Sequence, residues 1–264
     1  MRRLRALRIA VLLTVLAMVA LWAAATHKRR DRRLAWKRTV HAAVILLEPK
    51  PQAKARAPFE RGLEALQQWI ATEGARRRTL PEPPVDFELF GPVAAAAPQF
   101  EPPDDGLWTR AKHAWSLSRA LARLDAEAGL DASRFDLRLY VALEPASSGQ
   151  LSVEGAGEVG GDVALVRARD DGQLDLTLPA LAHELFHCFG ATDKYDAAGH
   201  ARVPDGLVEP ARGFPQQFGE IMVGEVPTAP GSGRLPASLA ELRVGDATAV
   251  ELRWLAQTRF SSGR

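Results

Sequence analysis

Residues 183–193 read H-E-L-F-H-C-F-G-A-T-D and place two histidines, His183 and His187, four positions apart. In a helix, residues at this spacing lie about one turn apart on the same face. Glu184 is next to the first histidine, and Gly190 stands where a helix of this length would end. The stretch therefore predicts a helix that presents two imidazoles together, with a carboxylate beside them.

Two imidazoles so placed can hold one zinc ion, and a catalytic zinc site has three protein ligands and one position for water. We expect His183 and His187 to be two ligands and the Asp193 carboxylate to be the third. Gly190 accepts the left-handed conformation that would turn the chain back toward the histidines. Glu184 is then the general base for a water whose pKa the zinc lowers. The pattern predicts peptide-bond hydrolysis in a peptide or protein substrate.

The same eleven residues resemble the H-E-x-x-H-x-x-G-x-x-H/D signature of metzincin-type zinc metallopeptidases. Some members of that clan have Asp where most have a third His, and Asp193 matches that variant. The resemblance implies that Met222, in G-E-I-M-V-G at residues 219–224, lies in a methionine-containing turn beneath the zinc. It also implies a C-terminal helix, which residues 246–257 fit with Asp246 as the N-cap. In that clan a tyrosine after the methionine can donate to the transition state. No tyrosine follows Met222 in this chain, so that donor is missing here.

Other residues compete for these roles. In the other large group of zincins the third ligand is a downstream Glu, which keeps Glu209 and Glu220 open as alternatives to Asp193. His200 is a weaker rival in a loop. Tyr195 is the second candidate catalytic residue, because its hydroxyl could stabilise an oxyanion, although a single Tyr can equally have a structural role.

Two further readings concern residues close to the motif. Asp193, Asp196 and Asp205 could help to bind calcium, but their spacing matches no EF-hand loop. Cys188 directly follows the second histidine, and on a helix it points about 100° away from it. We therefore expect Cys188 to be a small buried hydrophobic residue rather than a ligand.

The order of strands and helices expected between residues 39 and 264 predicts one α+β domain with a mixed sheet. Its metzincin-like form would have two long helices, the active-site helix and the C-terminal helix. In the helix expected at 107–128, Trp108 and Trp115 are taken as core residues together with Leu117, Leu121 and Leu124. The glycine-rich segment 149–162 is expected to be flexible or an edge strand. The expected strands are residues 39–47, 85–90, 135–143 and 163–168, and the other expected helices are 59–75 and 177–189.

The N-terminal segment, residues 1–38, has a different character. It carries a net charge of +10, whereas the remainder carries −8 and the whole chain +2. A mildly acidic domain argues against a nucleic-acid partner. Residues 9–25 form an apolar run, flanked by basic residues, that is just long enough to cross a bilayer. We favour an uncleaved signal anchor with the domain extracytoplasmic or periplasmic. A cleaved signal peptide and the opposite orientation are the alternatives.

Two functions follow from these features. The first is a membrane-anchored, zinc-dependent metallopeptidase with its catalytic domain at residues 39–264. The second is a zinc-stabilised binding or scaffolding module of the cell envelope that catalyses nothing. Loss of cleavage with retention of zinc in a Glu184 variant would distinguish the two.

Overall fold

The computed structural model describes residues 2–49, 56–102, 106–144, 154–157, 159–169 and 174–256. It contains a five-stranded mixed sheet with strand order β2-β1-β3-β5-β4. The strands are β1 (Val40–Leu47), β2 (Val85–Val93), β3 (Leu137–Glu144), β4 (Glu154–Gly157) and β5 (Val163–Arg169). Strands β2, β1, β3 and β5 are parallel, and β4 pairs antiparallel with β5. The predicted strands and mixed sheet are confirmed, and the glycine-rich segment contains the edge strand β4.

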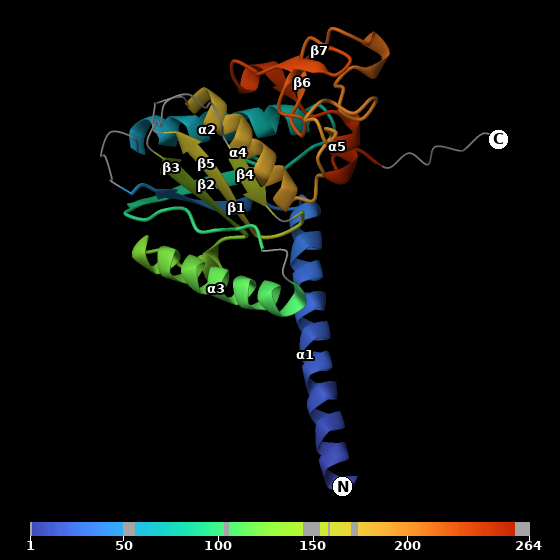
Figure 1. Cartoon of the computed structure of the whole chain (residues 1–264). Coiled ribbons are helices and arrows are strands. Elements are labelled where there is room, and N and C mark those ends of the chain that lie inside the picture. Colours follow the sequence, from blue (N-terminus) through green and yellow to red (C-terminus); the bar gives the residue numbers. More distant parts are fainter. Residues whose placement is uncertain are drawn as a thin grey trace, which may run out of the picture.

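Strand β1 reads V-H-A-A-V-I-L-L and has a parallel neighbour on each side. Seven of its eight residues are buried, because helices cover both faces of the sheet at this strand. On one face lie α2 (Arg56–Ala75) and α4 (Leu174–Cys188), and on the other lies α3 (Gly106–Glu127), as Figure 1 shows. The protein is therefore layered as helix, sheet and helix.

The two faces of the sheet have separate cores. Residues 42, 44 and 46 of β1 pack in the core that includes α2, α4 and the C-terminal segment. Residues 43, 45 and 47 pack in the smaller core beneath α3, which includes Tyr140, Leu121 and Leu124. This alternation is what a strand with both faces covered requires.

One expectation for α3 is wrong. Leu121 and Leu124 are buried as predicted, but the side chains of Trp108 and Trp115 are 73% and 64% exposed. Both tryptophans were expected in the core. The N-terminal half of α3 thus carries large aromatic groups on its outer surface.

The chain after α4 has little regular structure. It contains the short strands β6 (Gly219–Glu220), β7 (Val226–Ala229), β8 (Ser232–Arg234) and β9 (Leu242–Arg243), followed by α5 (Asp246–Glu251). Helix α5 is shorter than the helix expected at 246–257. Its N-cap is Gly245 rather than Asp246, and Asp246 instead pairs with Arg77 at 2.6 Å.

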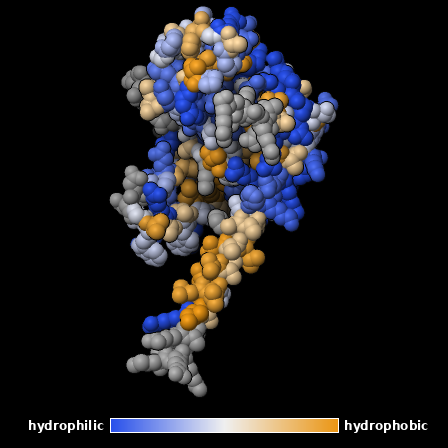
Figure 2. All heavy atoms as spheres, turned by 90° about the vertical axis from the view of Figure 1, so that its right-hand side faces the viewer, coloured by the Kyte–Doolittle hydropathy of each residue, from blue (hydrophilic) through white to orange (hydrophobic). Residues whose placement is uncertain are grey.

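The N-terminal helix α1 (Arg2–Leu34) extends away from this body (Figure 1). Its part from residue 8 onward is the one helix, among the described residues, that is long and apolar enough to cross a membrane. Figure 2 shows its apolar surface as the orange stalk below the domain. Its apolar side chains are exposed, including Leu12 at 68%, Leu16 at 63% and Leu21 at 71%.

The end of α1 is built into the domain. Leu34 and Trp36 belong to the larger core, so the packed domain begins before residue 39, the expected boundary. The Arg33 guanidinium is buried and donates to the carbonyls of Gly160 and Gly161 at 3.2 and 2.8 Å. Trp36 Nε1 donates to Leu252 O at 2.7 Å. These contacts fix the direction in which α1 leaves the domain.

Candidate metal centre

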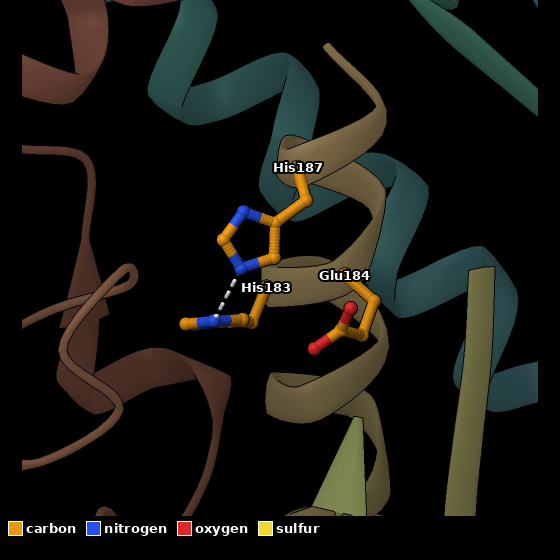
Figure 3. Close-up of side chains that lie close together, drawn as sticks. All are labelled: His183, Glu184 and His187. Carbon is orange, nitrogen blue, oxygen red and sulfur yellow. Dashed lines mark hydrogen bonds between the residues drawn. The ribbon is translucent and has the colours of Figure 1, made fainter. Parts of the chain in front are cut away.

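Helix α4 brings the two histidines together as predicted. His183 Nε2 and His187 Nε2 lie 3.0 Å apart (Figure 3), and the rings are nearly perpendicular, at 81°. His187 is buried and His183 is partly buried. With Glu184 they form a cluster whose ligand-type atoms all lie within 4.8 Å of one another.

The other nitrogen of each imidazole is held by a backbone carbonyl. His183 Nδ1 lies 3.0 Å from Ile221 O, and His187 Nδ1 lies 2.9 Å from Ala191 O. A carbonyl oxygen only accepts hydrogen bonds, so each Nδ1 must carry the hydrogen and each neutral ring presents a lone pair at Nε2. Backbone support of this kind sets the tautomer and orientation of metal-binding histidines.

Asp193 lies at the same point. Gly190, with φ of 93°, ends α4, and the chain returns so that Asp193 Oδ1 is 3.1 Å from both Nε2 atoms. Three acceptor atoms thus converge at 3.0–3.1 Å. A tetrahedral zinc site with ligand distances of about 2.0 Å requires donor atoms about 3.3 Å apart, so the donor set fits this ion closely.

The electrostatics of the cluster also favour a cation. Burial opposes the charged form of His187, but hydrogen bonding to Asp193 and Ala191 outweighs burial and raises the pKa of this imidazole. Burial likewise acts to raise the pKa of Asp193, but the His183 and His187 imidazoles, when protonated, donate to its carboxylate from Nε2 and hold this pKa well below its usual value. A positive charge is therefore stabilised between these three side chains, whether a proton or a metal ion carries it.

Glu184 is buried beside this point, with 5% of its surface exposed. Burial raises the pKa of its carboxyl above the usual value, against the lowering effect of His183 and His187. Glu184 Oε2 is buried and accepts no hydrogen bond from the described residues. A buried carboxylate with an unpaired oxygen and a raised pKa is suited to accept a proton.

Strand β4 lies directly against Glu184. A methyl group at Gly155 would collide with the Glu184 carboxylate, and one at Gly157 would come within 2.8 Å of Oε2. The absence of side chains at these two positions is what allows the carboxylate to occupy its place. The sequence showed that the segment is glycine-rich but not that it faces Glu184.

The loop that carries Asp193 is fixed by α5. Glu251 accepts hydrogen bonds from Thr192 N at 3.0 Å, from Thr192 Oγ1 at 2.8 Å and from Lys194 Nζ at 2.6 Å. Lys194 is only 3% exposed. Both neighbours of Asp193 are thereby tied to one carboxylate, and Arg202 also donates to Asp193 O. Sequence reasoning missed Glu251 and Lys194, and no motif points to them.

Met222 lies in a buried turn that touches the site. The residue before it, Ile221, supplies the carbonyl that binds His183, and Met222 O accepts from Lys194 N at 3.0 Å. Glu220 holds this turn from inside: its carboxylate accepts from Met222 N at 2.5 Å and from Gly245 N at 3.2 Å. The geometry thus gives Glu220 backbone partners and brings Asp193, not Glu220, to the histidines.

The remaining candidates lie in other positions. Tyr195 is 36% exposed, and its ring stacks on His183 with centroids 6.5 Å apart. Burial and the nearby Asp193 raise the pKa of its hydroxyl. His200 pairs with Glu225 at 3.4 Å, and the exposed Glu209 pairs with Arg212 at 3.4 Å.

The structure also locates the aspartates considered for calcium binding and the single cysteine. The Asp196 carboxylate accepts from Ala198 N and His200 N, so it closes a turn of its own loop. Asp205 is exposed. Cys188 is fully buried, and burial raises the pKa of its thiol to about 12, as expected for a small hydrophobic residue.

Comparison with known proteins adds no identification. No family model matches the chain, and no curated protein matches it. A solved chaperone–substrate complex is similar at 13% identity and a TM-score of 0.35, over 82% of this chain and 35% of that one. Wild-type OgpA from Akkermansia muciniphila is similar at 12% identity and a TM-score of 0.37, over 80% of this chain and 59% of that one. The chain spans less than two thirds of the length of either matched chain.

Proposed function

We propose that this protein is a membrane-anchored, zinc-dependent metallopeptidase with a metzincin-like domain. The observation that carries the proposal is the convergence of His183 Nε2, His187 Nε2 and Asp193 Oδ1 at 3.0–3.1 Å, with the buried Glu184 carboxylate beside them. These three atoms would hold the zinc. When bound, zinc supplies Lewis-acid polarisation of a carbonyl and acidification of a water molecule.

The residues of the chain provide the rest of the reaction. Glu184 Oε2 accepts a proton from the attacking water and passes it to the leaving amine, and its raised pKa supports this role. Tyr195 stacks on His183 and supports the site as a hydroxyl donor to the oxyanion. The carbonyls of Ile221 and Ala191 hold both imidazoles in the tautomer that ligation requires.

Strand β4 suggests how the substrate binds. Among the described residues β4 pairs only with β5, and its glycines lie against Glu184. An extended peptide that pairs with the edge of β4 opposite β5 would bring a peptide bond beside the carboxylate. We therefore propose a polypeptide substrate bound in extended conformation.

Helix α1 is proposed as a single-pass anchor with the domain extracytoplasmic. Its exposed apolar side chains and its continuity with the packed domain support an anchor that remains attached. Protease accessibility of the domain in intact cells, compared with inverted membrane vesicles, tests the orientation.

The test of the proposed function uses the full chain purified in detergent. We expect about one zinc per chain, loss of zinc in His187→Ala, and retention in the matched control His200→Ala. Glu184→Gln should keep zinc and lower cleavage of a peptide library by about 10²–10⁴-fold. Absence of zinc from the parent would refute the proposal. A parent that binds zinc but cleaves no peptide would instead establish the non-catalytic envelope module.

A further inference from the structure

Helix α3 has an outward face of unusual composition. Trp108, Lys112, Trp115 and Arg119 follow one another at intervals of four, three and four residues, and at 100° per residue they lie within a sector of about 60°. We call these four residues the tryptophan stripe. The exposed fractions of the two tryptophans, 73% and 64%, show that the stripe is not part of the core.

The stripe faces directly away from the sheet. The helix packs on the sheet through Leu117, Leu121 and Leu124, which lie on the opposite side of the helical wheel. Within the stripe, Lys112 Nζ lies 5.5 Å from the centre of the Trp108 ring, and the Arg119 guanidinium lies 4.5 Å from that of Trp115. Each aromatic ring is thus paired with a cation on the outer surface.

Charge adds to this pattern. Residues 106–124 include Arg110, Lys112, Arg119 and Arg123 and contain no acidic residue, although the chain after residue 38 is acidic overall. Leu107, at the start of the helix, is 87% exposed. An outer helix surface that combines tryptophan, leucine and basic side chains is typical of helices that lie in a membrane interface.

The position of α3 relative to α1 indicates which surface the outer face of α3 contacts. Figure 1 shows α3 on the face of the sheet toward which α1 extends, level with the upper, domain-proximal part of α1. The direction of α1 is fixed by the buried Arg33 and by Trp36. If α1 spans a bilayer, the outer face of α3 is therefore directed to the surface of the same bilayer.

We propose that the tryptophan stripe lies in the headgroup region of the bilayer that α1 spans, and that its partner is an anionic lipid surface. This inference rests on the membrane anchoring proposed above and is independent of the peptidase activity. The indole rings occupy the interface, and the basic side chains extend to lipid phosphates. Two attachments, α1 and α3, then fix the tilt of the domain and hold the metal centre at a constant height above the membrane.

The experiment uses spin labels on the full chain, reconstituted in vesicles of phosphatidylcholine and phosphatidylglycerol. Cys188 is fully buried and needs no replacement. Labels are attached at Ala111→Cys, beside the stripe, at Leu16→Cys in α1 and at Gln68→Cys, an exposed position on α2 across the sheet. Collision with oxygen, which enters membranes, is compared with collision with a polar nickel complex, which does not.

We expect labels at 16 and 111 to favour oxygen several-fold over the nickel complex relative to the label at 68. Replacing both tryptophans by serine should move the label at 111 toward the value at 68 and leave the label at 16 unchanged. Omitting phosphatidylglycerol should weaken the effect at 111 alone, because the basic residues then lose their anionic partner.

Three other outcomes of the spin-label experiment would contradict the proposal, and each has a different pattern of label accessibility. A label at 111 that behaves like the label at 68, with the label at 16 in lipid, would overturn the proposal and leave the anchor intact. A label at 16 in water would overturn both. A label at 111 shielded from both reagents would show a protein contact in place of lipid. Zinc content and peptide cleavage, measured on the same samples, report separately on the proposed function.

Discussion

Gly155 of β4 lies so close to Glu184 that any side chain at this position would collide with the carboxylate. The contact joins the edge of the sheet to the helix that carries the histidines. It makes the position of the proposed general base dependent on a residue that has no functional group.

Gly155→Ala should therefore lower peptidase activity while zinc remains bound. The methyl group displaces the Glu184 carboxylate, and a misplacement of about 1 Å costs about 100-fold in rate. The measurement is kcat/KM for a peptide substrate together with zinc content. Ala156→Ser is the matched control, because its neighbouring position on the same strand points to the other side of the sheet. Unchanged activity in Gly155→Ala would contradict the role given to this contact.

Glu251→Gln should weaken zinc binding without removing any ligand. Glu251 holds Thr192 and the buried Lys194, the two neighbours of Asp193, so the neutral amide loses its ion pair and loosens the Asp193 loop. Changes in groups that orient ligands typically lower metal affinity by about 10–100-fold. Competition with a chelator gives the affinity.

The control for this experiment is Glu241→Gln, which removes a similar pair with Arg234 away from the site. Zinc affinity should be unchanged in the control. Equal affinity in Glu251→Gln and the parent would mean that the Asp193 loop keeps its position without α5.

The parts of the site that the sequence predicted are those set by local geometry. His183 and His187 meet because four residues make about one helical turn, and Asp193 joins them because Gly190 allows the chain to turn back. Gly155 and Glu251 are separated from the motif by many residues, and only the packing of β4 and α5 brings them to it. Their contacts leave no periodic signal in the sequence.

In the fold, too, some elements could be predicted from the sequence and others could not. Strand β1 was recognisable from its continuous apolar run, because a strand with two neighbours and two covered faces must be apolar throughout. Helix α3 has apolar residues on two opposite sides, and the sequence could not show which side met the sheet. Leu121 and Leu124 do, whereas Trp108 and Trp115 face outward.

Tyr140→Phe should destabilise the domain through the smaller core. Tyr140 Oη donates to Asp125 Oδ1 at 2.5 Å, and Arg138 donates to Asp125 Oδ2 at 2.6 Å. Removal of the hydroxyl leaves one oxygen of a buried carboxylate without its donor, which costs about 1.5–3 kcal/mol. The free energy of unfolding of the full chain in detergent measures the effect. A change close to zero would show that water replaces the hydroxyl.

Asp136→Asn should lower stability at neutral pH, with a difference that shrinks in acid. Burial acts to raise the pKa of Asp136, but hydrogen bonds from Arg38 at 2.6 and 2.7 Å and from His41 N at 3.1 Å lower it below the usual value of an aspartate. A carboxyl whose folded pKa is lowered stabilises the protein above its unfolded pKa, and this contribution is lost as pH falls through the folded value. The melting temperatures of Asp136→Asn and the parent should therefore differ at pH 7 and converge at low pH.

Asp86→Asn, at a half-exposed carboxyl that pairs with His41 at 3.4 Å, is the control and should show a smaller difference. A difference between Asp136→Asn and the parent that stays constant from neutral to acid pH would mean that the hydrogen-bonded charge of Asp136 contributes nothing to stability.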